Sequence, residues 1–161
     1  MFNFRQVSRK SGTDLLNSEL YDEKSFYGSF VKDLKSAEKS IVIESPFLTE
    51  KRAVQFSKLF KRLYKRGIYL RVNTRDPKHH DKLLEIQAWK AIKVLRKARV
   101  KVYICSDMRH RKLAIIDNTI LWDGSLNIMS QSNSKEIMRR TRSEALCKQM
   151  IQFTKLNNRF W

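Results

Sequence analysis

Helical and strand patterns alternate along the first hundred residues, and this alternation limits the fold more than any other feature. Three segments carry apolar residues at helical spacing, and a short apolar run follows each of them. The helical segments are 25–37, 50–66 and 80–98, and the strand segments are 40–46, 68–73 and 100–104. Strands separated by helices pair in parallel, because the helix carries the chain back along the sheet. We therefore expect a parallel core with helices on both faces.

The second part of the chain departs from this alternation. Strand patterns follow one another closely from residue 110 to residue 141, which predicts antiparallel pairing at one side of the sheet. A turn or short helix is expected at 127–132 and a last helix at 143–157. The predicted fold class is α/β with a mixed sheet, and no linker or repeat divides residues 1–161 into more than one domain. For residues 1–24 we expect an edge strand near Phe2–Val7 or a disordered start, with a short helix at 13–20.

Three chemically distinct side chains stand at fixed spacing in the middle of this second part. His110, Lys112 and Asp117 form the pattern His-x-Lys-x4-Asp, and Gly124-Ser125-x-Asn127 follows after six more residues. In an extended chain residues i and i+2 share a side, so the imidazole and the ammonium point together while the aspartate falls on the other side. An imidazole beside an ammonium suits a phosphate, because the cation neutralises an oxygen while the ring acts on phosphorus or the leaving group. The glycine turn could aim N–H groups, a hydroxyl and an amide at the same anion.

This spacing resembles the signature of the phospholipase D superfamily, and every fixed position of that signature is met. The resemblance implies a mixed sheet between two helical layers. It also extends to Glu136, at the place where family members carry a later acid. For this acid the resemblance implies a hydrogen bond from the far nitrogen of His110, which would hold the imidazole in one tautomer.

The resemblance further implies a two-step displacement at phosphorus. One histidine attacks to give a phosphohistidine, a second protonates the leaving oxygen, and water completes hydrolysis. Because His79 and His80 are followed by Asp81 and Lys82, they form no second motif, and a homodimer is expected to supply the second histidine. No metal or other cofactor is expected, because lysines and backbone donors would supply the positive field.

The expected site contains eight residues. Lys112, Ser125 and Asn127 would hold the phosphate. Arg75 and Arg109 would line the groove, although a solvated surface charge is a nearly even alternative for both. Asp117 counts among the catalytic residues, with a structural or supporting role favoured over direct chemistry.

The charge balance indicates a polyanionic partner. The chain has 34 Lys and Arg against 16 Asp and Glu, a formal charge of +18. Nucleic acid is the commonest polyanion, with a merely solvated basic surface and an anionic membrane as alternatives. No apolar run is long enough to span a bilayer, and the N-terminus lacks a signal-peptide core, so we expect a cytoplasmic protein. Cys105 and Cys147 are expected to be free thiols. Core packing, and not base stacking, is expected for the aromatic residues Trp89, Trp122, Trp161, Tyr64 and Phe60.

Together these features predict a metal-independent endonuclease, with DNA favoured as substrate and a helicase or a restriction or defence protein as a possible partner. The alternatives are an RNA-cleaving enzyme of the same chemistry, a lipid-acting phosphatidyl transferase, and a non-catalytic nucleic-acid-binding subunit.

Overall fold

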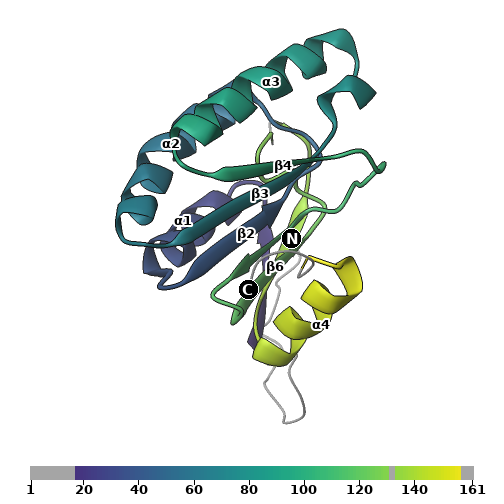
Figure 1. Cartoon of the computed structure of the whole chain (residues 1–161). Helices are drawn as coiled ribbons and strands as arrows, with labels where there is room; N and C mark the ends of the chain where they lie inside the picture. Colours follow the sequence, from purple (N-terminus) through teal and green to yellow (C-terminus); the bar gives the residue numbers. More distant parts are fainter. Residues whose placement is uncertain (1–16, 131–132, 157–161) are drawn as a thin grey trace.

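A computed structural model describes residues 17–130 and 133–156 and shows a mixed sheet with helices on both faces (Figure 1). Its strands are β1 (Ser18–Asp22), β2 (Ser40–Glu44), β3 (Tyr69–Arg75), β4 (Lys101–Cys105), β5 (Leu113–Ile116), β6 (Ile120–Gly124) and β7 (Ile137–Arg142). Its α-helices are α1 (Phe26–Ser36), α2 (Glu50–Lys65), α3 (Lys82–Lys97) and α4 (Glu144–Thr154), and a 3-10 turn, η2, covers Pro77–His79. The predicted fold class is confirmed.

The sheet joins a parallel half to an antiparallel half. Its strand order is β1-β7-β6-β5-β2-β3-β4. Strands β2, β3 and β4 pair in parallel through the crossovers α2 and α3, and β2 pairs with β5 antiparallel. Strands β5, β6, β7 and β1 continue as antiparallel neighbours. The change from alternating to closely spaced patterns in the sequence therefore marks the boundary between the two halves.

Two apolar layers cover the two faces of the sheet. Helices α1, α2 and α3 pack on one face, and α4 packs on the other (Figure 1). Strand β2 shows how one strand serves both layers, because Ile41 and Ile43 join the larger cluster while Val42 joins the cluster under α4. Trp122 is fully buried in the larger layer, and its indole donates to Asp33 of α1 at 2.8 Å.

Side-chain caps begin most of the helices where the sequence predicts. Thr49, Asp81 and Ser143 accept backbone N–H groups at the starts of α2, α3 and α4. The chain leaves α2 through Gly67, whose φ of 83° is readily adopted by glycine. The helices of the described residues include none that is long and apolar enough to cross a bilayer.

One local prediction near the N-terminus is wrong. Residues 18–20 of the expected short helix belong to the edge strand β1, because Ser18 to Asp22 pair with Thr141 to Ile137 of β7. Tertiary pairing overrides the weak local helical pattern here. The expected strand at Phe2–Val7 lies outside the described residues. The two cysteines are free thiols, as expected.

Candidate active site

The topology brings the ends of several strands to one edge of the sheet. The carboxyl ends of the parallel strands β2 and β3 lie at this edge, followed by residues 45–49 and 76–81. Strand β5 runs antiparallel to β2, so its amino end, preceded by His110 and Lys112, reaches the same edge. The carboxyl end of β6 and the amino end of β7 follow by the same alternation. Segments from distant parts of the chain therefore meet around the motif.

His110 and Lys112 lie together, as the spacing predicts. The Lys112 ammonium is 2.7 Å from Nδ1 and 3.4 Å from Nε2 of the His110 ring, and it donates to the His110 carbonyl at 2.7 Å. Both residues precede β5, so the segment is extended without being part of a strand ladder. Desolvation, followed by the charges of Lys112 and Arg75, lowers the pKa of His110 below its usual 6.5. The lowered pKa favours the neutral imidazole at pH 7, the state in which a ring nitrogen is a nucleophile.

The residues on either side of His110 face the opposite way and are held by a buried acid. Arg111 donates to Oε1 of Glu44 at 2.8 Å, and Arg109 approaches the same oxygen at 3.5 Å. Glu44, at the end of β2, is fully buried. Arg109 also forms a two-pronged pair with Asp107, at 2.6 and 2.7 Å. The expectation that Arg109 lines the phosphate site is therefore wrong, because its guanidinium is neutralised on the other side of the extended chain.

Arg75, at the end of β3, does lie near His110. Its charge contributes to the lowered pKa of His110, and its guanidinium lies 5.6 Å from the Phe47 ring centroid. The Phe47 ring in turn meets His110 edge-on at 5.7 Å. The placement supports the predicted role of Arg75 as a cation near the phosphate.

Sequence reasoning missed Phe47 and placed His80 outside the site. Phe47 lies between His110 and His80, whose ring centroid is 4.8 Å away. Within the described residues neither ring nitrogen of His80 has a hydrogen-bond partner, although both are buried. Desolvation lowers the pKa of His80, and the charge of Arg75 lowers it further. No local pattern signals this cluster, because its members come from three separate loops.

Gly124 and Ser125 lie against the start of β7. A Cβ on Gly124 would meet the Ile137 carbonyl at 2.1 Å, so the motif glycine permits a close approach between two backbones. Ser125 donates its N–H to that same carbonyl at 2.9 Å, and its hydroxyl donates to Glu136. Glycine is therefore required by packing at position 124, and Ser125 is hydrogen-bonded to Glu136, the acid predicted from the sequence.

The position of Glu136 corrects one predicted contact. Its carboxylate accepts from Ser125 and, at 2.7 Å, from Ser134, and the described residues show no hydrogen bond between it and His110. The acid acts instead on Lys112, whose pKa is lowered by burial and raised by the Glu136 charge. Two serine hydroxyls thus donate to this carboxylate, and its charge acts on Lys112.

The turn that carries Asn127 is joined to the loop after β2. Thr49 donates to the Met129 carbonyl at 3.0 Å, and the Met129 N–H donates to the Ser45 hydroxyl at 3.2 Å. Oδ1 of Asn127 is buried, and the described part of the chain offers it no hydrogen-bond partner. A phosphate oxygen could be bound only by the amide Nδ2 donor, because Oδ1 is itself an acceptor. The predicted role of Asn127 in phosphate binding therefore stays a prediction.

Asp117 lies apart from this cluster, at the opposite end of β5. Its carboxylate accepts three backbone N–H groups at 2.8 Å each, from Glu38, Lys39 and Ser40. Its inclusion among the catalytic residues is therefore wrong, and the structural role favoured from the strand alternation is the one observed. The motif aspartate joins the turn after β5 to the start of β2.

No three His, Cys, Asp or Glu side chains of residues 17–130 and 133–156 gather in a way that could hold a metal ion.

The family model described as "Cardiolipin synthase, PLD-like domain" matches residues 30–157. With the fold and the complete motif, this match defines the class: the chain belongs to the phospholipase D superfamily and has the fold and motif of its phosphodiesterases.

Several solved structures superpose on this chain. NucT from Helicobacter pylori superposes with a TM-score of 0.68 and 20% identity, covering 86% of this chain and 92% of that chain. Nuc from Salmonella typhimurium, a phospholipase D family member, gives 0.67 and 18%, covering 84% and 90%. Phosphatidylserine synthase from Haemophilus influenzae gives 0.59 and 14%, covering 88% of this chain and 38% of that chain. No curated protein sequence matches the chain. At these identities the superpositions establish the fold.

Proposed function

We propose that the chain is a metal-independent nuclease that cleaves phosphodiester bonds, with DNA as the favoured substrate. The observation that carries this proposal is the position of the Lys112 ammonium beside the His110 ring, 2.7 Å from Nδ1. A neutral imidazole can attack phosphorus, and the adjacent cation can stabilise the charge that grows on the phosphate oxygens. Arg75 adds a second positive charge close to the same ring.

The reaction proceeds in two displacements. A nitrogen of the neutral His110 forms a bond to phosphorus as the bond to the leaving oxygen breaks. A second histidine, which enters this step as the imidazolium, donates a proton to that oxygen and becomes neutral. Water then attacks the phosphohistidine, gives its proton to the second histidine, and releases His110. Lys112, Ser125 and Asn127 hold the phosphate through both steps.

The second histidine is His110 of the partner subunit in a homodimer. The chain has one motif, and exposed apolar side chains surround the end of the sheet that carries it. Met108, two residues before His110, is 66% exposed, and Leu83, in the first turn of α3, is 69% exposed. Figure 1 places the β4–β5 loop and the start of α3 at this same end. Exposed apolar side chains of this kind are suited to an interface between subunits.

Nucleic acid is the favoured substrate because of charge. The excess of Lys and Arg gives +18, so phosphate contacts and counterion release would supply most of the affinity. Binding of this kind carries little sequence preference.

The experiment that tests the proposal compares wild type with His110→Ala on plasmid DNA, single-stranded DNA and structured RNA in low salt with excess EDTA. We expect DNA cleavage that survives EDTA and disappears in the variant, with a phosphorylated His110 trapped at short times. Cleavage of RNA alone would change the substrate. Loss of activity in EDTA that is restored by a divalent cation would overturn the mechanism, and binding without cleavage in both proteins would favour a non-catalytic subunit.

A further inference from the structure

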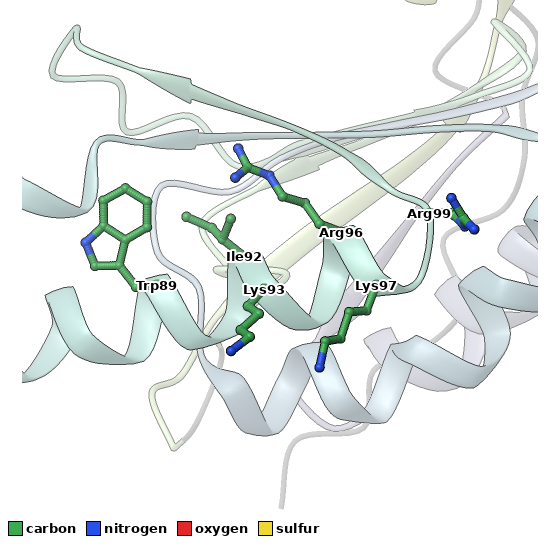
Figure 2. A pocket seen from close by; sticks show the side chains of 6 residues that line it. All are labelled: Trp89, Ile92, Lys93, Arg96, Lys97 and Arg99. Atoms are coloured by element: carbon green, nitrogen blue, oxygen red, sulfur yellow. The ribbon is translucent and has the colours of Figure 1, made fainter.

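A hollow on the outer surface of α3 combines an exposed indole with four cations. It has a volume of about 590 Å³ and is lined by Trp89, Ile92, Lys93, Arg96, Lys97 and Arg99. In Figure 2 the side chains of Trp89, Ile92 and Arg96 extend to one side of α3 and those of Lys93 and Lys97 to the other. Arg99 lies in the loop after the helix. Ile92 is 2% exposed, so it forms a floor between the cations and the core. The volume is within the range of small-ligand sites.

Trp89 does not have the core role that the sequence suggested. Its side chain is 39% exposed, and Tyr64, also expected in the core, is 49% exposed. Trp122 and Phe60 are buried as predicted, and Trp161 lies outside the described residues. Its indole N–H donates to Glu85 one turn earlier, at 3.4 Å, which holds the ring against the helix. A tryptophan fixed beside cations offers a face on which a nucleic-acid base can stack.

The cations of the hollow have no acidic neighbours along the chain. Between Glu85 and Asp107 the sequence contains six Lys or Arg and not one Asp or Glu. The described residues provide no ion pair to Lys93, Arg96 or Lys97, although Lys90 nearby pairs with Glu50 at 3.7 Å. Arg99, the fourth cation, has its guanidinium 5.9 Å from the Tyr64 ring centroid. The charge therefore remains available to an external polyanion.

The hollow lies on the same helix that starts beside the proposed active site. Helix α3 begins two residues after His80, whose ring packs on Phe47 beside His110. Lys93 is eleven residues further along, about 17 Å at 1.5 Å per residue. At about 3.4 Å per nucleotide of a stacked strand, about five nucleotides would span from the start of α3 to Lys93, and a strand that also reaches His110 would be longer.

We propose that the hollow on α3 is a second binding site for single-stranded nucleic acid, with one base on Trp89 and its phosphates on Lys93, Arg96 and Lys97. This inference rests on the proposed function, because it takes nucleic acid as the substrate. A membrane surface fits less well, because the indole lines a hollow instead of projecting from a convex apolar face. The site would hold the flanking strand while the motif acts on one phosphate.

The test measures binding of fluorescein-labelled dT3 and dT15 to His110→Ala, alone and combined with either Trp89→Ala or the triple change Lys93→Ala, Arg96→Ala and Lys97→Ala. A control triple with the same change of charge replaces Lys32, Lys35 and Lys148, which are exposed on α1 and α4. Turnover of bis(p-nitrophenyl) phosphate by Trp89→Ala with His110 intact reports the catalytic centre separately. Vesicles of phosphatidylglycerol and phosphatidylcholine test the membrane.

We expect Trp89→Ala to weaken dT15 binding roughly 5- to 150-fold, the range for loss of one stacked base. The α3 triple should reduce the slope of log affinity against log salt by about 2, because single strands release about 0.7 counterion per contact. In Trp89→Ala, binding of dT3 and turnover of bis(p-nitrophenyl) phosphate should change less than twofold. The control triple should keep more of its affinity for dT15 than the α3 triple does.

Equal dT15 affinity in the Trp89 variant, the α3 triple and the parent would overturn the inference, and so would losses confined to vesicle binding. If the wild type cleaves no nucleic acid but the α3 changes still weaken dT15 binding, the proposed nuclease function fails while the binding site stands. If the wild type cleaves nucleic acid and the α3 changes have no effect on dT15 binding, the binding site on α3 fails while the proposed nuclease function stands.

Discussion

Replacing Asp117 should destabilise the fold while leaving the chemistry intact. The carboxylate accepts three backbone N–H groups, two at exposed residues and one at buried Ser40. Water can replace the aspartate at Glu38 and Lys39, so the buried donor sets most of the cost, about 1–3 kcal/mol. Asp117 also has a φ of 52°, a conformation that costs alanine a further 1–2 kcal/mol or so. We expect Asp117→Ala to lower the free energy of unfolding by about 2–5 kcal/mol.

Asparagine provides the matched comparison. It tolerates positive φ and keeps one carbonyl oxygen, which can still accept from Lys39 and Ser40 as Oδ1 does now. Asp117→Asn should therefore cost only about 1–2 kcal/mol. His110→Ala, at an exposed position, should remain within about 0.5 kcal/mol of wild type.

Urea denaturation and turnover separate the two roles. With a slope of about 2 kcal/mol per molar, the midpoint of Asp117→Ala should fall by about 1–2.5 M. Turnover per folded molecule, measured at low temperature, should stay within about twofold of wild type. An unchanged midpoint together with lost turnover would refute the structural role, and so would an Asp117→Asn variant that is stable but inactive.

Three further predictions concern the motif and its surroundings. Lys112→Met removes a charge that lowers the pKa of His110, so the pKa of His110 should rise. The acidic limb of the pH profile of kcat/KM should then move to higher pH, and turnover should fall about 10²- to 10³-fold. An acidic limb that stays at the same pH would contradict the reasoning. Gly124→Ala places a methyl group 2.1 Å from the Ile137 carbonyl, and thermal unfolding should show a loss of about 1–3 kcal/mol or more, whereas wild-type stability would mean that β7 moves freely. Met108→Glu introduces a charge at the proposed interface, so sedimentation should show monomers and kcat should fall together with the dimer fraction; full activity as a monomer would exclude a site completed by the partner subunit.

The order of helices and strands was predictable because apolar periodicity is a local signal. It placed the helices α1, α2 and α3 and the strands β2, β3 and β4 within a few residues of their observed ends. The edge strand β1 was not predictable, because its residues are mostly half-buried or exposed and become a strand by pairing with β7, more than a hundred residues later.

The motif predicted the pairing of His110 with Lys112 and the requirement for glycine at 124, since both follow from spacing along one segment. The contacts of Glu136, the pairing of Arg109 with Glu44 and the position of Phe47 depend on how separate loops meet at the sheet edge. Trp89 shows the same limit, because its helical spacing is compatible with either a core residue or a surface residue, and only the packing of α3 decides between them.

The buried Glu44 has a consequence for the cost of binding. By holding Arg109 and Arg111, it fixes both neighbours of His110 through side chains that take no part in the proposed chemistry. The conformational entropy of this extended segment is therefore lost when the protein folds and is not lost again when a substrate binds. A substrate phosphate would therefore meet a backbone segment that is already ordered, with the His110 and Lys112 side chains already in contact on it.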